Sequence, residues 1–258
     1  MGTSRYIQRM ANIAQASESH ARAVAIEVRD LVVIRGRNRV LDSLSVDVPQ
    51  GSVTGLLGPS GCGKTTLIRS IVGVQIVESG TVQVLGEPAG SASLRERVGY
   101  VTQSSSVYPD LTVAQNLHFF AAIAGADSAA IAGALDNVGL GDTADSLTGN
   151  LSDGERTRVS IAASLLADPD IYLLDEPTVG LDPVLRRDLW QLFANLATGG
   201  KTLLVSSHVM DEAGRCDRVL LMRKGRLIAD ATPDELRAQT GEDDLEKAFL
   251  ILAERPAT

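Results

Sequence analysis

Residues 58–66 read GPSGCGKTT and follow directly on the apolar run at residues 52–57. The stretch fits the pattern G-x-x-x-x-G-K-[ST], and a helix-compatible segment, residues 66–74, comes next. Glycines allow backbone N–H groups to curl around phosphate oxygens, and the N-terminus of the following helix adds positive potential. A chance glycine-rich turn is the alternative, but the strand before it and the helix after it favour a phosphate-binding loop.

Lys64 and Thr65 carry the charged and the metal-binding side chains of this loop. In loops of this type the lysine reaches the β- and γ-phosphates, and the hydroxyl beside it ligates Mg²⁺. We therefore predict that Thr65 is a metal ligand. The loop residues expected to line the nucleotide are Gly58, Pro59, Ser60, Gly61, Cys62, Gly63, Lys64, Thr65 and Thr66.

Cys62 has two interpretations. A thiol at a helix N-terminus has a lowered pKa and would be sensitive to oxidation. A small side chain that fits the loop is the simpler explanation, and we favour it. With Cys216 it makes two cysteines in the chain, too few for a disulfide framework, which indicates a reducing compartment.

A second motif, IYLLDE at residues 171–176, is an apolar run that ends in two carboxylates. In ATPases with a phosphate-binding loop, the first carboxylate orders the metal shell, and the second orients or deprotonates the attacking water. Such a run is common by itself, and its place downstream of the phosphate loop gives it meaning. We predict Asp175 as a metal ligand and Glu176 as the catalytic base.

Hydrophobic periodicity predicts an α/β fold. Strands are expected at residues 24–28, 44–48, 52–57, 82–84, 98–101, 171–174, 202–205, 218–223 and 226–230. Between residues 112 and 166 the apolar side chains follow i, i+3, i+4 spacing, which predicts helices instead. Thr232 and Glu235 predict the capping box of another helix, with Pro233 at its first position. The layout is α/β with a helical insertion in its middle.

Bulk properties exclude several classes of protein. The 258 residues predict one or two domains, with 44% apolar residues and a net charge of −8. An acidic chain is a poor candidate for coating nucleic acid or anionic lipid. Mean hydropathy is +0.08, so we expect no membrane-spanning segment. No apolar block follows Arg5 and Arg9, and a secretory signal is not expected.

Further motifs follow in order, and with them the sequence resembles the ATP-binding subunits of ABC transporters. Gln103 matches the Q-loop glutamine, and LSDGE at residues 151–155 matches the signature usually written LSGGQ. VGLD at residues 179–182 matches the D-loop, and SSH at residues 206–208 ends a strand where the family places its switch histidine. The resemblance covers residues 24–250.

The resemblance implies a P-loop NTPase core with an antiparallel β subdomain and an inserted α-helical signature subdomain. An ABC ATPase domain would occupy residues 23–240, its catalytic core residues 23–104 and 168–240, and its helical subdomain residues 105–167. Residues 241–258 would form a short C-terminal helix or tail. Residues 1–22 are polar and weakly patterned and predict a loosely ordered extension, with a short amphipathic helix as the alternative.

The resemblance also implies roles for single residues, with ATP and Mg²⁺ as cofactors. Gln103 would bind ATP and contact the metal together with Thr65 and Asp175, and His208 would be catalytic beside Glu176. The residues implied to reach the ATP of a second subunit are Ser152, Asp153, Gly154, Glu155 and Asp182.

Some of these residues also have plainer explanations. Ser152 with Glu155 three residues later fits an ordinary capping box, and His208 alone would be an ordinary histidine at a strand end.

The sequence departs from the family pattern at three positions. Arg35 stands where the family usually stacks an aromatic residue on adenine. A guanidinium plane also stacks on a base, so Arg35 is expected to bind ATP with less selectivity for the base. Asp153 replaces a glycine and Glu155 a glutamine, and negative charge near a phosphate costs affinity unless it points away.

The partners implied are a second ATP-binding subunit, either identical or a paralogue, and an integral membrane permease. ATP would lie at composite sites between the two ATP-binding subunits. The permease would dock between Gln103 and Asn116, and residues 108–113 and 208–213 look like those of bacterial exporters. The chain would then sit at the cytoplasmic face of the cell membrane, touching it only through the permease, with no nucleic acid involved.

Two other functions remain open from the residues. One is a soluble ABC ATPase without a transporter, such as an iron–sulfur assembly factor, which would lack the exporter-like stretch after Gln103. The other is a regulatory nucleotide-binding module without turnover, and the presence of Glu176 and His208 argues against it.

Overall fold

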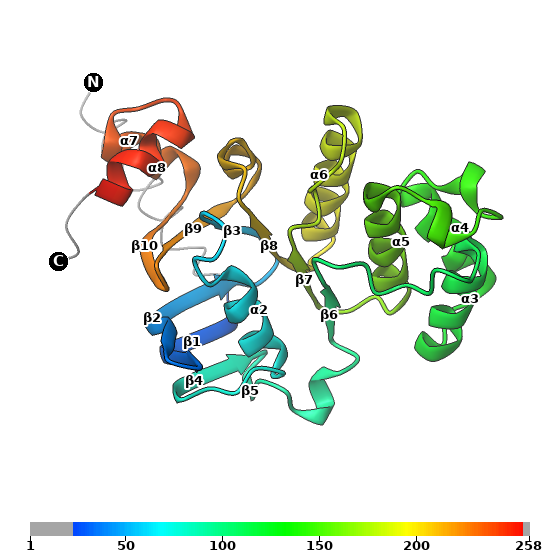
Figure 1. The fold of residues 1–258 in the computed structure, drawn as a ribbon, viewed down its shortest axis with the longest axis horizontal. Helices are drawn as coiled ribbons and strands as arrows, with labels where there is room; N and C mark the ends of the chain where they lie inside the picture. The colour runs from blue at the N-terminus through cyan, green and yellow to red at the C-terminus, as the bar shows by residue number, and fades with distance from the viewer. Residues whose placement is uncertain (1–22, 255–258) are drawn as a thin grey trace, which may run out of the picture.

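The computed structural model describes residues 23–254, which form two sheets (Figure 1). The antiparallel sheet has the order β2-β1-β4-β5, with β1 (Val24–Arg35), β2 (Asn38–Pro49), β4 (Ser79–Val84) and β5 (Glu87–Pro88). The other sheet has the order β10-β9-β3-β8-β7-β6, with β3 (Val53–Leu57), β6 (Val98–Val101), β7 (Ile171–Asp175), β8 (Thr202–Ser207), β9 (Arg218–Arg223) and β10 (Arg226–Ala231). All pairs in this sheet are parallel except β9 with β10.

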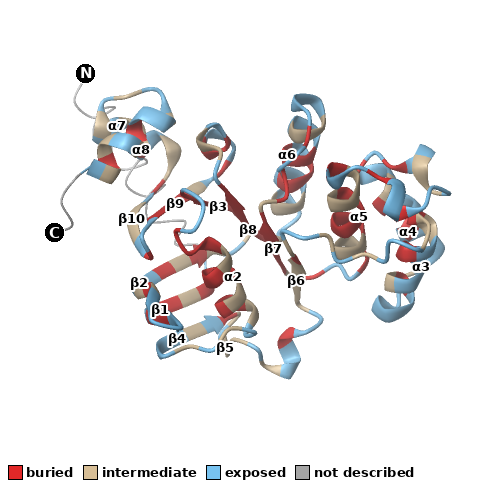
Figure 2. Cartoon of the chain, viewed as in Figure 1, coloured by how far each residue is buried: buried red, intermediate tan, exposed pale blue. Residues whose placement is uncertain are grey.

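The central parallel strands are buried on both faces, which explains their uninterrupted apolar runs. In β8, Leu203 and Val205 belong to one hydrophobic core and Leu204 to the other. The same alternation occurs in β7, where every residue is buried. Figure 2 shows this burial concentrated along the middle of the sheet.

One core lies between the two sheets and contains α2 (Lys64–Val72). Leu67, Ile68 and Ile71 of this helix are buried there with residues of β1, β2 and β3. The second core, on the other face of the parallel sheet, contains α6 (Pro183–Thr198) and the buried faces of the remaining α-helices. Because α2 lies in the first core, it is packed between the two sheets directly after the phosphate loop.

Three helices form a group at one end of the molecule, between β6 and β7 in the chain (Figure 1). They are α3 (Val113–Ala124), α4 (Ser128–Asn137) and α5 (Asp153–Leu166), joined through the short turns η2 (Gly141–Thr143) and η3 (Thr148–Asn150). Asn116 is buried among them, accepts from the Tyr108 N–H at 2.8 Å and donates to the Thr148 hydroxyl at 3.0 Å. It therefore ties the segment before α3 to the helical group.

The remaining elements are η1 (Ala92–Leu94), η4 (Met210–Arg215), α7 (Pro233–Thr240) and α8 (Leu245–Glu254). α7 begins with the predicted capping box of Thr232 and Glu235. α8 falls in the predicted C-terminal segment, and residues 1–22 lie outside the described part of the chain. Within residues 23–254, every helix is too short or too polar to traverse a bilayer.

The predicted α/β fold, with an antiparallel sheet and inserted helices, is confirmed. The lengths of β1 and β2 were predicted too short, at residues 24–28 and 44–48. The alternation of β1 is broken by a register shift between Val28 and Leu31, where Asp30 has φ 49°. Such a bulge moves the following side chains to the opposite face, so period-two counting stops there although the strand continues.

The turn between β9 and β10 also contacts the phosphate loop. Lys224 and Gly225 both have positive φ, as a tight hairpin turn requires. The Gly225 N–H donates to the Cys62 carbonyl at 2.9 Å, and the Gly225 carbonyl accepts from the Asp42 N–H at 3.0 Å. A Cβ at Gly225 would lie 2.3 Å from the Val40 carbonyl oxygen, so this turn packs against both β2 and the phosphate loop.

We predict that Gly225→Ala destabilises the protein more than Gly241→Ala. Both glycines have φ near +75°, but a Cβ at Gly241 meets nothing within 4 Å. Gly241→Ala, the control, should lower the free energy of unfolding by about 1–2 kcal/mol because of the left-handed backbone alone. Gly225→Ala should lower it by a further ~1–3 kcal/mol because of the clash. Urea unfolding of both variants measures the difference, and equal losses would contradict the proposed packing of the turn.

Candidate active site

The phosphate loop connects β3 to α2, with α2 beginning at Lys64. The Gly58 N–H donates to the Ser207 carbonyl at 3.3 Å, and a Cβ at Gly58 would lie 2.3 Å from the Met222 carbonyl oxygen. Gly63 is the N-cap of α2 with φ 114°, and no side chain caps the helix. The first-turn N–H groups of α2 are therefore left without a side-chain cap, as an anion site requires.

Lys64 is folded back onto its own loop. Its side chain is 4% exposed, and Nζ donates to the Gly58 carbonyl at 2.8 Å and lies 3.4 Å from Glu176 Oε1. A buried ammonium needs such partners to offset its desolvation. A polyphosphate in the loop would offer stronger charge partners than the carbonyl, so this ammonium is placed to transfer to it.

Asp175 is the last residue of β7 and is buried. Its Oδ1 accepts from the Ser206 hydroxyl at 2.7 Å. Its Oδ2 is also buried and has no hydrogen-bond partner among the described residues. A buried carboxylate oxygen without a partner is costly, and a hydrated divalent cation would satisfy it, so the donor set fits Mg²⁺.

The Glu176 carboxylate lies close to three side chains that come from three different segments. Oε1 is 3.4 Å from Lys64 Nζ, while Oε2 is 3.2 Å from His208 Nδ1 and 3.4 Å from Gln103 Nε2. Glu176 has φ 53°, a backbone conformation that costs about 1–2 kcal/mol for such a residue. Strain of this kind persists where the surroundings impose it, as at functional sites.

The parallel sheet explains why these residues meet. Gln103, Glu176 and His208 each follow the carboxyl end of a parallel strand, and the phosphate loop follows β3. Carboxyl ends of parallel strands lie at one edge of the sheet, where ligands bind in open α/β sheets. Of the predicted residues, the structure brings together Lys64, Gln103, Asp175, Glu176 and His208, and Thr65 lies in the adjoining first turn of α2.

Ser152 is the N-cap of α5 and forms a capping box with Glu155. The Ser152 hydroxyl donates to Glu155 Oε2 at 2.7 Å, and the Ser152 N–H donates to the same oxygen at 2.8 Å. These two bonds, first from the side chain and then from the backbone, lower the pKa of Glu155. The hydroxyl is thus already bound to a carboxylate of its own chain.

Asp153 and Gly154 behave differently from each other. The Asp153 side chain is 91% exposed and pairs with Arg156, so its charge is solvated and partly neutralised. A Cβ at Gly154 would lie 2.9 Å from Leu181 Cδ2, which keeps α5 close to the segment before α6.

Asp182 and Arg35 make their contacts outside the group of side chains around Glu176. The Asp182 carboxylate caps α6, accepting from the N–H groups of Val184 and Leu185. Arg35 is exposed at the end of β1, opposite Asn38. Among the described residues, neither they nor residues 152–155 are hydrogen-bonded or ion-paired to the loop.

Cys62 is buried, and this burial raises the pKa of its thiol despite the nearby Lys64. A Cβ at Gly58 would lie 2.8 Å from Cys62 Sγ. A buried thiol with a raised pKa resists oxidation, which supports its interpretation as a packing residue.

Ser206 is a residue of this site to which the sequence motifs assign no role. Its hydroxyl donates to Asp175 and accepts from the Glu176 N–H at 2.9 Å. The available signal was a polar residue directly after the apolar run at residues 203–205, where a buried strand would require an internal hydrogen-bond partner.

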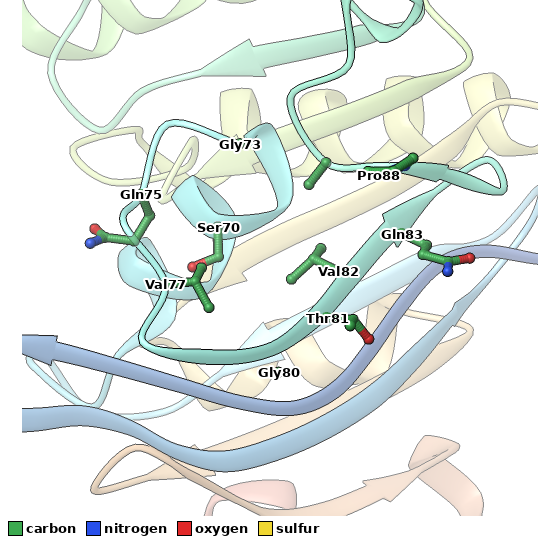
Figure 3. A pocket seen from close by; sticks show the side chains of 10 residues that line it. Ser70, Gly73, Gln75, Val77, Gly80, Thr81, Val82, Gln83 and Pro88 are labelled. Atoms are coloured by element: carbon green, nitrogen blue, oxygen red, sulfur yellow. The ribbon is translucent and has the colours of Figure 1, made fainter.

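A hollow of about 330 Å³ lies elsewhere, between α2 and β4–β5 (Figure 3). Ser70, Val77, Gln83 and Pro88 are among the residues that line it, and none of its lining residues is ionisable. It includes none of the predicted site residues, so we assign it no part in nucleotide binding.

Comparison with known proteins places the chain in a family. Residues 41–179 match the family described as "ABC transporter". The chain is 39% identical to the probable multidrug ABC transporter ATP-binding protein YbhF of Escherichia coli (strain K12), covering 88% of this chain and 41% of that protein. It is also 39% identical to the Nod factor export ATP-binding protein I of Burkholderia orbicola, covering 86% and 75%.

Solved structures agree with this placement. The ATP-binding subunit of an ABC transporter matches with a TM-score of 0.80 and 26% identity, over 90% of this chain and all of that one. CbiO1 of Clostridium perfringens, part of the ABC transporter complex cbiONQ, matches with a TM-score of 0.75 and 28% identity, over 89% and 96%. The motifs, their geometry and these likenesses agree, and the chain belongs to the ABC transporter family as one of its ATP-binding domains.

Proposed function

We propose that the chain binds and hydrolyses ATP as the ATP-binding subunit of an exporter-type ABC transporter and drives a separate membrane permease. The observation that carries this is the convergence of Lys64, Gln103 and His208 on Glu176, beside a loop that suits phosphate. Such a group of residues can bind a triphosphate and polarise a water. A change in its contacts can also move the neighbouring segments. The name of the Nod factor export relative supports export, and the multidrug name of the Escherichia coli relative is compatible with it.

Each residue of the site has a distinct task. Lys64 leaves the Gly58 carbonyl and binds the β- and γ-phosphates, while the loop N–H groups hold the remaining oxygens. Thr65, Gln103 and Asp175 would hold Mg²⁺, which when bound neutralises charge on the phosphates. Glu176, freed from Lys64, accepts a proton from the attacking water, and His208 holds that carboxylate in place.

A second subunit completes the site. Ser152 and Gly154 would face the γ-phosphate held by the partner, with Asp153, Glu155 and Asp182 at the edge of the same contact. A two-fold arrangement would create two such sites. ATP would favour the closed dimer by mass action, and hydrolysis would release it. An identical chain or a paralogue fits this scheme.

An exposed aromatic cluster supports permease docking beside Gln103. Tyr108 and Phe119 are both exposed and pack edge to face at 5.1 Å between ring centroids, and Phe120 stacks with Tyr108 at 6.5 Å. Ile123, which lies on α3 with Phe119 and Phe120, is 70% exposed. An apolar patch of this kind marks a protein contact, and a permease there would hold the chain at the cytoplasmic face of the membrane.

Replacement of the proposed base tests hydrolysis. We expect Glu176→Gln to lower the ATPase rate by about 10²–10⁴-fold, since that is what a general base contributes, and to trap a dimer in ATP-Mg²⁺ on gel filtration. Glu96→Gln, at an exposed residue, is the matched control and should behave as the wild type. A fully active Glu176→Gln would refute the assignment of the base.

The Glu155 carboxylate, in the signature at residues 151–155, gives a second test. Glu155 holds the Ser152 hydroxyl and adds negative charge where the partner's γ-phosphate would bind. Glu155→Gln keeps a capping box but removes about 1 kcal/mol or more of charge repulsion. We expect about fivefold less ATP to drive half-maximal dimerisation in the Glu176→Gln background.

Asp153→Asn is the control for this measurement, because its carboxylate is exposed and paired with Arg156. It should shift the ATP requirement less than Glu155→Gln. A higher ATP requirement in Glu155→Gln/Glu176→Gln than in the Glu176→Gln parent would contradict the expected repulsion and show that the carboxylate helps to bind the partner's nucleotide.

The alternative function is a soluble ABC ATPase without a transporter. Purification of the chain from membranes of the native source distinguishes this function from that of a transporter subunit. We expect an integral membrane subunit to copurify with the wild-type chain and to be lost with Ile123→Ser, at unchanged ATPase activity of the isolated chain. Leu250→Ser, at a residue 53% exposed on α8, is the matched control. Copurification of soluble proteins only would favour the alternative.

A further inference from the structure

Ser206 is a polar residue at the most buried part of the molecule. It lies in β8, between β3 and β7, opposite Leu56 on one side and Asp175 on the other. Its exposed fraction is 0%. A hydroxyl buried in an apolar sheet is costly unless its hydrogen bonds are made, so its partners decide what it contributes.

The two partners of Ser206 are the two residues of the carboxylate pair. The Glu176 N–H donates to Ser206 Oγ at 2.9 Å, and Ser206 Oγ donates to Asp175 Oδ1 at 2.7 Å. The direction of both bonds follows from chemistry, because an amide N–H only donates and a carboxylate only accepts. One hydroxyl therefore joins the backbone of one acidic residue to the side chain of the other.

We propose that Ser206 is a positioning residue for ATP hydrolysis, which sets the Asp175 carboxylate and the Glu176 backbone together. This inference rests on the proposed roles of these two acidic residues. Ser206 itself need not touch nucleotide, water or metal.

On Asp175, the hydroxyl decides which oxygen is free. With Oδ1 bound to Ser206, Oδ2 is the oxygen without a partner among the described residues. Loss of the donor would leave both oxygens of a buried carboxylate unsatisfied and the side chain free to rotate. Partners that orient a metal-binding group in this way typically change metal affinity or activity by about 10–100-fold.

On Glu176, the hydroxyl holds a strained backbone. The residue has φ 53°, and its N–H has Ser206 Oγ as acceptor. Strained conformations persist only where neighbouring contacts enforce them. Without this acceptor the backbone can relax, and the side chain would move from its contacts with Lys64 and His208.

The neighbouring Ser207 shows that a buried hydroxyl at this edge is not sufficient. Its Oγ accepts from the Val209 N–H at 3.0 Å and serves the segment that leads from His208. Side chains alternate along a strand, so Ser206 points to the other face. The proposed role depends on the position of Ser206 opposite Asp175.

Three substitutions test the proposal. Ser206→Ala removes the hydroxyl, and Ser206→Cys keeps a side chain of similar shape that donates weakly. Thr54→Val is the matched control, because Thr54 lies in the adjacent strand β3, is fully buried, and its hydroxyl has no partner among the described residues. Urea unfolding first establishes that each variant is folded.

Two readouts are then compared: steady-state ATPase kinetics, and the affinity for a fluorescent ATP analogue in Mg²⁺ and in EDTA. For Ser206→Ala we expect kcat to fall by about 10–100-fold, and the affinity gained from Mg²⁺ to shrink by a similar factor, with a corresponding rise in KM for ATP-Mg²⁺. Ser206→Cys should be intermediate, and Thr54→Val should match the wild type in both readouts.

Wild-type kcat and wild-type Mg²⁺ dependence in a folded Ser206→Ala or Ser206→Cys protein would overturn the proposal. Equal losses in Ser206 variants and Thr54→Val would also overturn it, because packing alone would then explain them. A wild-type chain without ATPase activity would refute the proposed function itself, which is a different result from an active wild type with unaffected Ser206 variants.

Discussion

The parallel pairing of β7 with β8 is the constraint on which the site depends. It places Asp175 opposite Ser206, and the strand ends then deliver Glu176 and His208 to the same edge as the phosphate loop. Because both faces of these strands are covered, the register cannot slip without moving apolar side chains out of both cores. Hydrophobic burial thus fixes the positions of the charged groups.

Those side chains contact one another at the edge of the sheet. Lys64 bonds to its own loop and approaches Glu176, whose other oxygen meets Gln103 and His208. In the proposed function, a nucleotide would replace these contacts with phosphate. The same exchange would free the proposed base, so that binding and activation would be one rearrangement. The Ser152 hydroxyl is bound to Glu155 and would likewise have to be released to meet the phosphate of a second subunit.

Most of the fold and several site residues could be predicted from local sequence. The phosphate loop, the strand ending in Asp175 and Glu176, the turn at Lys224 and Gly225, and the helix start at Thr232 all depend on neighbours within a few residues. The roles of single residues in nucleotide binding stay predictions. In particular, no hydrogen bond or ion pair in the described part of the chain joins residues 152–155 to the phosphate loop.

The sequence by itself therefore determined the family, the order of the elements and which residues end the buried strands, because periodicity and turn chemistry are local. Only the tertiary structure decided the bulge at Asp30, the support of Cys62 by Gly225, and the bridge from Ser206 to Asp175 and Glu176. The contacts of Gly225 with Cys62 and of Ser206 with the two acidic residues join positions at least 30 apart in the chain. Such contacts depend on strand register and packing in the folded chain, which no short window of sequence contains.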